Sequence, residues 1–214
     1  QNPTSYTIED KNITLKKLED KENSKFLGWY DKAVGGNKIT SIDTSKLENI
    51  ILYAQWEEDK LYLKSQKYKV GENDIDIYEE SDIYLDKIEP ETTVAELINN
   101  CDTNGTITVI NEEGEVLGED DLVGTNMTIK VTRNDEEIIL TAVVMGDLDG
   151  NGKVTATDLS ALNQTVLKII EIKDAVFKAA DLDDNEKITA TDLSTINNAI
   201  LKNITLTYDK NPTN

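Results

Sequence analysis

The sequence predicts a multi-domain α+β protein made of three segments. Three observations support this prediction: short alternating strand patterns in residues 1–57, mixed strand and helix signals in residues 58–145, and two nearly identical loop–helix units in residues 146–214. At 214 residues the chain has room for one large domain or for two to three small ones. We expect the first segment to be a small sheet, the second to be α+β and rich in strands, and the third to be all-α.

The first segment contains aromatic strand patterns separated by turn signals. The run FLGWY at 26–30 is followed by a Gly-Gly-Asn turn at 35–37 and by LYAQW at 52–56. The expected core residues are Trp29, Trp56 and either Phe26 or Tyr53. Exposed aromatics can stack on sugars instead, but large aromatics at alternating positions of a small sheet are more often core residues.

This aromatic pattern resembles the Listeria-Bacteroides repeat, in which F-x-G-W-Y is followed by L-Y-A-x-W, as in the B repeat of internalin B. The resemblance covers about 50 residues of the chain. It implies a small β-grasp-like unit of the kind that is strung in tandem in bacterial surface proteins.

The second segment combines several strand patterns with one well-marked helix. The strands are expected near 67–70, 75–78, 83–88, 106–110, 127–132 and 137–144. Thr93 and Glu96 form a capping box ahead of Leu97, which predicts the start of a helix. The pattern resembles the X-modules that directly precede some dockerins.

The junction between the second and third segments is short. The last strand ends at Val144, two residues before the third segment begins at Gly146, which leaves almost no linker. We expect a rigid junction in which the second segment shields apolar surface of the first helix that follows. The alternative is a spacer that only touches its neighbour.

The composition argues against several classes of function. The net charge of −20 argues against nucleic acid and anionic membrane surfaces as partners, since phosphate binding relies on clustered Lys and Arg. The chain contains no histidine, which rules out Ser-His-Asp and Cys-His catalysis by these residues. Cys101 is the only cysteine, so we expect a buried, inert thiol. No run of about 18 apolar residues predicts insertion into a membrane.

We expect no enzyme activity from these residues. The many Asp and Glu residues are compatible with a carboxylate pair for glycoside hydrolysis, but no segment is long enough to form a substrate cleft. The N-terminus lacks a basic-then-apolar signal, and its first residues, QNPTSYT, look like the middle of a module. We therefore expect a C-terminal fragment, with any targeting segment or catalytic domain upstream.

The third segment contains two copies of an acidic loop, DLDGNGKVTATD at 147–158 and DLDDNEKITATD at 181–192. Over 22 residues from the start of each loop, fourteen positions are identical at an offset of 34. Oxygen side chains at loop positions 1, 3, 5 and 12 suit Ca²⁺, which takes six to eight oxygen ligands. These side chains belong to Asp147, Asp149, Asn151 and Asp158, and to Asp181, Asp183, Asn185 and Asp192. The remaining candidate ligands are the carbonyls of Lys153 and Lys187 at position 7, and Thr155 and Thr189 at position 9.

The two loops differ at position 6, where a sharp turn is needed. The first loop has Gly152 there and the second has Glu186. A non-glycine residue at positive φ costs about 1–2 kcal/mol, so we expect the second site to be weaker or more distorted. A strand pattern precedes the first loop where a full EF-hand would have a helix, and the segment has no methionine-rich groove. A calcium sensor is therefore not expected.

Amphipathic runs follow both loops and predict one helix each. In the first run Leu159, Leu162, Val166 and Ile169 lie on one helical face, as Leu193, Ile196 and Ile200 do in the second. A short linking helix is expected around residues 172–180.

Residues 146–204 resemble a type I dockerin through GDLDGNGKVTATDLS, the linking helix and ADLDDNEKITATDLS. The resemblance implies a pair of F-hand calcium loops, two bound Ca²⁺ ions and a cohesin module as the partner. It also implies a secreted or cell-surface bacterial protein that docks into a cellulosome-like complex and is otherwise monomeric. The implied cohesin contacts are Ala156, Thr157, Asn163, Gln164 and Lys168, and their counterparts Ala190, Thr191, Asn197, Asn198 and Lys202. The Ala-Thr pairs differ from the family's best-known Ser-Thr pair, which leaves the type of cohesin open.

The repetition of ATDLS has a physical consequence of its own. Two helices related by an internal two-fold would present nearly the same surface after a half-turn, so a partner would have two possible orientations. The alternative is that the repetition only serves the pairing of the helices. In the C-terminal tail we expect Tyr208 or Pro212 to pack near Met145 and Gly146, with a disordered tail as the alternative.

Overall fold

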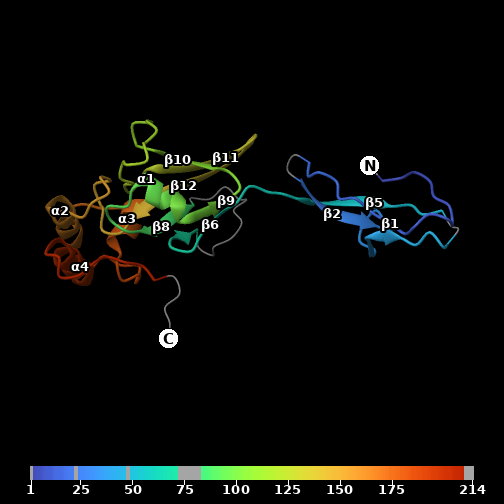
Figure 1. Ribbon diagram of the computed structural model, residues 1–214. Coiled ribbons are helices and arrows are strands. Elements are labelled where there is room, and N and C mark those ends of the chain that lie inside the picture. Colours follow the sequence, from blue (N-terminus) through green and yellow to red (C-terminus); the bar gives the residue numbers. More distant parts are fainter. Residues whose placement is uncertain (1, 22–23, 47–48, 72–82, 210–214) are drawn as a thin grey trace. The chain divides into compact units, whose positions relative to one another are not determined.

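The computed structural model describes residues 2–21, 24–46, 49–71 and 83–209. The chain divides into two compact units, residues 1–60 and 61–214 (Figure 1). The second and third predicted segments both lie within the second unit. The strand predicted at 75–78 lies outside the described residues. No helix among the described residues is both long enough and apolar enough to span a membrane.

The first unit is built from short antiparallel strands. Its strands are β1 (Ile13–Thr14), β2 (Ser24–Tyr30), β3 (Lys38–Ile39), β4 (Ser41–Ile42) and β5 (Tyr53–Glu58). Strand β2 lies between β3 and β5 in a three-stranded sheet, and β1 pairs with β4. No helix occurs among the described residues of this unit, and its β-grasp-like topology stays a prediction.

An aromatic cluster forms the centre of the three-stranded sheet. The ring of Phe26 meets Trp29 and Trp56 edge-on, with centroid distances of 5.7 and 5.2 Å. The indole Nε1 of Trp29 donates a hydrogen bond to the carbonyl of Lys16 at 2.8 Å. Tyr53 is 37% exposed, so Phe26 is the residue that completes the cluster. Because these rings pack against one another, the core interpretation is favoured over sugar stacking.

The second unit contains a five-stranded mixed sheet and a two-stranded ribbon. Its strands are β6 (Leu63–Ser65), β7 (Lys69–Val70), β8 (Tyr84–Ile88), β9 (Cys101–Thr103), β10 (Thr106–Ile110), β11 (Thr128–Arg133) and β12 (Glu136–Val144). The large sheet has the order β10-β11-β12-β8-β7, in which only the β12–β8 pair is parallel. The ribbon β6-β9 was not predicted.

Cys101 lies in the β6-β9 ribbon. The prediction of a buried thiol is met only in part, since the residue is half-buried. Burial nevertheless raises the pKa of the Cys101 thiol to about 12, which keeps the sulfur protonated at neutral pH.

Helix α1 (Val94–Asn99) begins at the predicted capping box. The Thr93 hydroxyl accepts the N–H of Glu96 at 3.2 Å, and the Glu96 carboxylate accepts the N–H of Thr93 at 3.1 Å. Val94 and Leu97 join the apolar core beneath one face of the large sheet, with Leu140 and Val144 of β12. The intervening Val143 points to the opposite face, as the two-residue period of a strand requires.

Three helices follow the sheet: α2 (Ala156–Val166), α3 (Asp174–Ala180) and α4 (Ala190–Ile200). Helices α2 and α4 lie side by side, and α3 links them (Figure 1). Leu162, Ala180 and Ile196 are fully buried and form the common core of the three helices. Helix α2 ends at Val166, and Lys168 has φ +58°. Ile169 therefore lies beyond the helix and is 65% exposed, which corrects its predicted place on the apolar face.

The junction between sheet and helices is packed and contains no free linker. Val143 is fully buried against Ala175 and Ala179 of α3, and the Gly146 N–H donates to the Ala179 carbonyl at 2.8 Å. The sheet therefore meets α3 at this point, whereas we had expected it to shield α2. The contact fits the predicted rigid junction and not a spacer.

The C-terminal tail returns to the same junction. Leu206 is buried, and a methyl group added to Gly146 would lie 3.1 Å from Leu206 Cδ1. The residue that packs there is thus Leu206, which had not been selected. Tyr208 is half-buried, and Pro212 lies outside the described residues.

Candidate metal sites and partner-binding face

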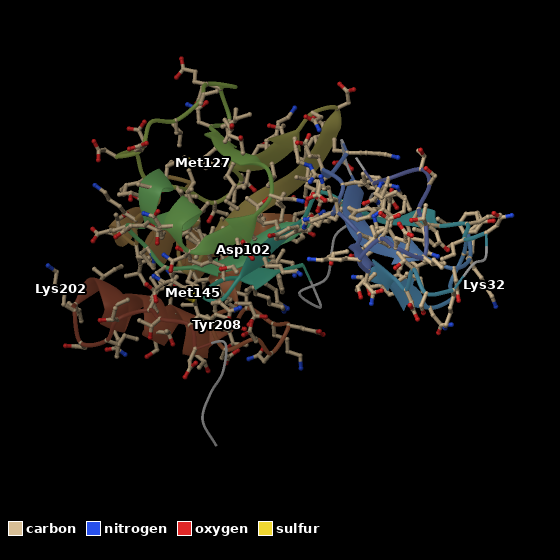
Figure 2. All side chains as sticks on the ribbon, turned by 45° about the vertical axis from the view of Figure 1, so that its right-hand side comes forward. Lys32, Asp102, Met127, Met145, Lys202 and Tyr208 are labelled. Atoms are coloured by element: carbon tan, nitrogen blue, oxygen red, sulfur yellow. The ribbon has the colours of Figure 1, made fainter. Side chains whose placement is uncertain are left out.

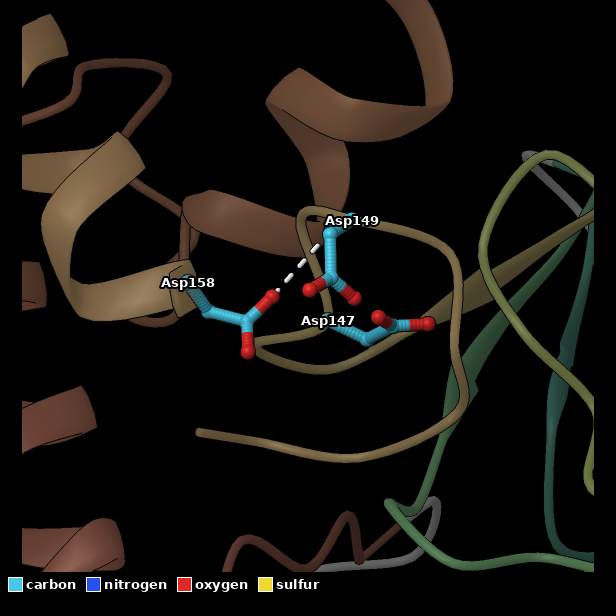
Figure 3. A group of neighbouring side chains, drawn as sticks. All are labelled: Asp147, Asp149 and Asp158. Carbon is cyan, nitrogen blue, oxygen red and sulfur yellow. Dashed lines mark hydrogen bonds between the residues drawn. The ribbon is translucent and has the colours of Figure 1, made fainter. Parts of the chain in front are cut away.

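The first loop brings three predicted ligands together. One carboxylate oxygen from each of Asp147, Asp149 and Asp158 lies within 4.8 Å of the others. Figure 3 shows the three side chains converging, with Asp158 at the start of α2 and the other two on the loop. The Asp149 N–H also donates to Asp158 Oδ1 at 3.1 Å, so the helix start and the loop are joined directly.

Asp147 is the buried centre of this loop. Its Oδ1 accepts the Gly150 N–H at 2.9 Å, and its Oδ2 accepts the N–H groups of Gly152 at 3.0 Å and Thr125 at 2.8 Å. The pKa of Asp147 is raised to about 6, chiefly by burial and to a smaller extent by the negative charges of Asp158 and Asp149, against the lowering effect of the hydrogen bonds from Thr125 and Gly152. A bound cation would remove this repulsion.

Thr125 comes from the loop between β10 and β11 and was missed by the sequence analysis. It is 1% exposed, and its hydroxyl also accepts the Val144 N–H at 3.1 Å. No local motif links Thr125 to the acidic loop, because only the folded sheet brings the two together.

The second loop repeats the arrangement of the first. Asp181, Asp183 and Asp192 offer carboxylate oxygens within 4.8 Å of one another. Asp181 Oδ2 accepts the Glu186 N–H at 2.8 Å, and burial raises the pKa of Asp181. Glu186 has φ +60°, as expected from its position, and Asp184 has φ +54°. Two non-glycine residues in the left-handed region thus strain the second loop.

The last acidic residue of each loop also caps a helix. Asp158 Oδ2 accepts the Thr155 N–H at 2.8 Å, while the Thr155 hydroxyl accepts the Thr157 N–H at 3.2 Å. Thr189 and Asp192 form the same capping box at the start of α4. The conformations of the loops and the starts of the helices are therefore coupled.

The donor set fits a hard cation. The clustered ligand atoms are carboxylate oxygens, which suit Ca²⁺. Asn151 and Asn185 are exposed at position 5, and Asn151 Oδ1 accepts the Lys153 N–H at 2.9 Å. The side chains of Lys153 and Lys187 are exposed, and the roles of their carbonyls stay predictions.

The predicted partner contacts lie at matching places on α2 and α4. Ala156, Thr157, Asn163 and Lys168 are exposed, as are Ala190, Thr191, Asn197 and Lys202, while Gln164 and Asn198 are both half-buried. Lys168 and Lys202 each follow the helix with φ +58°. Figure 2 shows Lys202 pointing away from the body of this unit, just beyond α4.

A groove runs between the two helices and is lined equally by both. Its lining residues are Ala156, Leu159, Ser160 and Asn163 of α2, and Ala190, Leu193, Ser194 and Asn197 of α4. Each α2 residue has its α4 counterpart 34 positions later. The Leu and Ser residues were not selected as contacts, although their place in the repeated ATDLS motif was a usable signal.

Comparison with protein families assigns the pair of loop–helix units to a known family. The family model of the dockerin type I domain matches residues 145–201. Residues 145–201 are a type I dockerin domain. The Listeria-Bacteroides repeat domain matches residues 1–55, which confirms the second resemblance. No curated protein and no solved structure matches the chain. Residues 56–144 lie outside both matched ranges, and their likeness to an X-module stays a prediction.

A dockerin domain indicates docking to a cohesin in a cellulosome-like complex. Dockerin domains bind Ca²⁺, and the two acidic clusters of this chain are suited to metal ions. Proteins that carry dockerins are extracellular or attached to the cell surface.

The two loops should respond in opposite ways to changes at position 6. Glu186→Gly should raise the free energy of unfolding of the metal-free dockerin by about 1 kcal/mol, because it relieves strain at φ +60°. Gly152→Ala should lower it by about 2 kcal/mol, because its Cβ would lie 2.7 Å from the Val123 carbonyl oxygen at φ +78°. Urea unfolding followed by circular dichroism measures both effects. A loss of stability in Glu186→Gly would show that the strain is absent.

Proposed function

We propose that this chain attaches a bacterial extracellular protein to a cohesin through its dockerin, with Ca²⁺ bound in both acidic loops. The observation that carries this proposal is the groove between α2 and α4, which both repeats line with the same residue types. Exposed side chains that play no part in the packing of the helices need not be repeated. Their repetition at Thr157 and Thr191 is best explained by selection for a partner.

The equivalence of the two helices supports two binding orientations. Ala156 and Asn163 of α2 and their counterparts Ala190 and Asn197 of α4 line the same groove, so a half-turn that exchanged the two helices would exchange equal residues. A cohesin surface that fits one arrangement therefore fits the other. The Ala-Thr pairs set the size and polarity of the contact and would select among cohesins.

Calcium would act as a structural ion in this function. The carboxylates of Asp147, Asp149 and Asp158 would hold one ion, and those of Asp181, Asp183 and Asp192 the other, each with the neighbouring Asn oxygen. The ion supplies positive charge that removes repulsion among these acids. Because Asp158 and Asp192 are also capping residues, occupied loops would fix the starts of α2 and α4.

The described residues would have no catalytic role. The remaining segments would serve as structure: residues 1–57 as a surface-protein repeat and residues 58–145 as a support for the dockerin. Two alternatives belong to other classes. One is an adhesion or cell-wall spacer with a calcium-stabilised cap, and the other is the non-catalytic C-terminal part of a glycoside hydrolase.

A pull-down against a panel of bacterial cohesins, with and without Ca²⁺, tests the proposal. Capture of at least one cohesin that is lost in chelator is the expected result. Failure to bind any cohesin of the source genome in Ca²⁺ would favour the spacer. Release of sugar from a polysaccharide panel by the chain itself would show that these residues are catalytic.

A further inference from the structure

The two metal loops differ in charge as well as in strain. Loop positions 4 and 6 are glycines in the first loop, Gly150 and Gly152, but carboxylates in the second, Asp184 and Glu186. The acidic residues of the second loop are Asp181, Asp183, Asp184, Glu186 and Asp192, against Asp147, Asp149 and Asp158 in the first. Each loop contains one lysine, so the second loop is more negative by two charges.

Packing explains why the first loop has glycines at these positions. A Cβ on Gly150 would lie 2.9 Å from the Thr125 carbonyl oxygen, and one on Gly152 would lie 2.9 Å from Leu122 Cβ. The Glu91 N–H donates to the Gly152 carbonyl at 2.7 Å. The part of the second unit that precedes the dockerin, residues 61–144, is called the sheet unit below; it covers this side of the first loop and leaves no space for side chains. Asp184 and Glu186 are exposed, so the second loop is not covered in this way.

A buried cation of the sheet unit, Lys87, contacts the second loop. Lys87 lies in β8, is 4% exposed and has φ +64°. Its Nζ lies 2.5 Å from Asp184 Oδ1, although the two residues are 97 positions apart. Burial of an ammonium group is unfavourable unless a counter-charge meets it. Asp86 lies beside Lys87 on the same strand and is also buried, so its negative charge acts on the Lys87 ammonium as well.

The position of Asp184 places this cation next to the metal ligands. Asp184 lies directly between Asp183 and Asn185, two predicted ligands of the second site. The ammonium of Lys87 therefore offsets part of the excess negative charge of the second loop whether or not a metal ion is present. The first loop meets the sheet unit through Thr125 and backbone groups.

We propose that Lys87 is a built-in counter-cation of the second calcium loop, which stabilises that loop without metal and lowers its affinity for Ca²⁺. The inference rests on the proposed function, because it assumes that Ca²⁺ binds there. A unit positive charge on the order of 10 Å from a divalent ion, at an effective dielectric constant of about 50–80 and at low ionic strength, weakens binding by about three- to tenfold. The two sites then fill at different Ca²⁺ concentrations.

An electrostatic role for Lys87 and a purely structural role predict opposite changes in the Ca²⁺ affinity of the second site when Lys87 is removed. If Lys87 only held the loop in place, its removal would weaken Ca²⁺ binding at the second site. If Lys87 competes with the ion, Lys87→Met should raise the affinity of that site about three- to tenfold. The gain should shrink at high salt, since ions screen the interaction. Lys87→Arg keeps the charge and should behave like the wild type.

Calorimetric titration of the full chain with CaCl₂ gives the two affinities. NMR signals of the Gly152 and Glu186 amides, which donate to Asp147 and Asp181, assign them to the two sites. The matched control is Lys130→Met, which removes a lysine that pairs with Glu137 within the same sheet. Lys130→Met should leave both affinities unchanged. Lys87→Met should leave the affinity of the first site unchanged.

A second variant keeps the buried lysine in place. Asp184→Asn changes an exposed side chain and removes the charge that offsets Lys87, so it should weaken the second site about three- to tenfold. The inference would be overturned if the Ca²⁺ affinity of the second site were unchanged or lower in Lys87→Met, or unchanged in Asp184→Asn. Either result would leave the proposed function standing. Absence of Ca²⁺ binding by the wild-type chain would overturn the proposed function as well.

Discussion

Removal of Ca²⁺ with a chelator should lower the melting temperature of the second unit by about 10–20 °C and abolish cohesin capture. Each site filled at a hundred times its dissociation constant adds about 2.7 kcal/mol, so two sites add about 5 kcal/mol. For a unit of residues 61–214 this corresponds to the stated shift. Helicity should fall too, because Asp158 and Asp192 both cap helices and are proposed metal ligands. Circular dichroism melts and a cohesin pull-down measure these effects.

The pH dependence of the stability of the chelated protein tests whether repulsion at the acidic loops causes the loss of stability. Asp147 has a pKa of about 6 in the metal-free fold, above its ordinary value. Above pH 6 the carboxyl of Asp147 is ionised and lowers the stability of the metal-free fold, and this loss shrinks as the pH falls from 6 towards the ordinary pKa of 3.8. The gap in melting temperature between Ca²⁺-loaded and chelated protein should narrow from pH 7 to pH 5. Equal melting temperatures with and without chelator at pH 7 would rule out a structural role for the ion.

Replacement of both exposed threonines at the helix starts should weaken cohesin binding at least a hundredfold, about 3 kcal/mol. Thr157→Glu and Thr191→Glu place a charge on the proposed contact face, and an acidic residue in the first turn of a helix is well tolerated. Either change alone should reduce affinity only about twofold, because one of two equivalent orientations survives. Calorimetry with a cohesin that the wild type captures in Ca²⁺ measures these affinities.

The matched control for the double variant is Thr205→Glu with Thr207→Glu. These two threonines are exposed in the C-terminal tail and are not among the predicted contact residues of α2 and α4. The control should bind as the wild type does. Complete loss of binding from one single change would show one fixed orientation, and full binding by the double variant would move the contact face elsewhere.

Much of this molecule could be predicted because the relevant signals are local. The capping box at Thr93 and Glu96 uses residues three positions apart, and it is present as expected. The acidic loops follow a fixed spacing within twelve residues, and their carboxylates converge. The internal repeat at an offset of 34 residues lies within residues 145–201, the range that matches the type I dockerin domain. Strands β10, β11 and β12 matched their alternating patterns to within one residue.

Features that depend on contacts between distant parts of the chain were not predictable in this way. The short ribbon β6-β9 pairs segments whose own patterns are too brief to mark a strand. Leu206 packs at Gly146 and was not selected from the sequence, because the path of the tail depends on the surface it returns to. Ile169 is exposed because α2 ends early, a boundary that periodicity alone does not fix.

The sequence by itself determined that two oxygen-rich loops precede two matching helices, since spacing and repetition are properties of the chain. Only the tertiary structure decided that the loops have unequal surroundings. Thr125 and the glycine contacts lie against the first loop, and Lys87 reaches Asp184 of the second. The physical reason is that a sheet can meet a pseudo-symmetric pair from one side only, so identical motifs come to lie in different electrostatic environments.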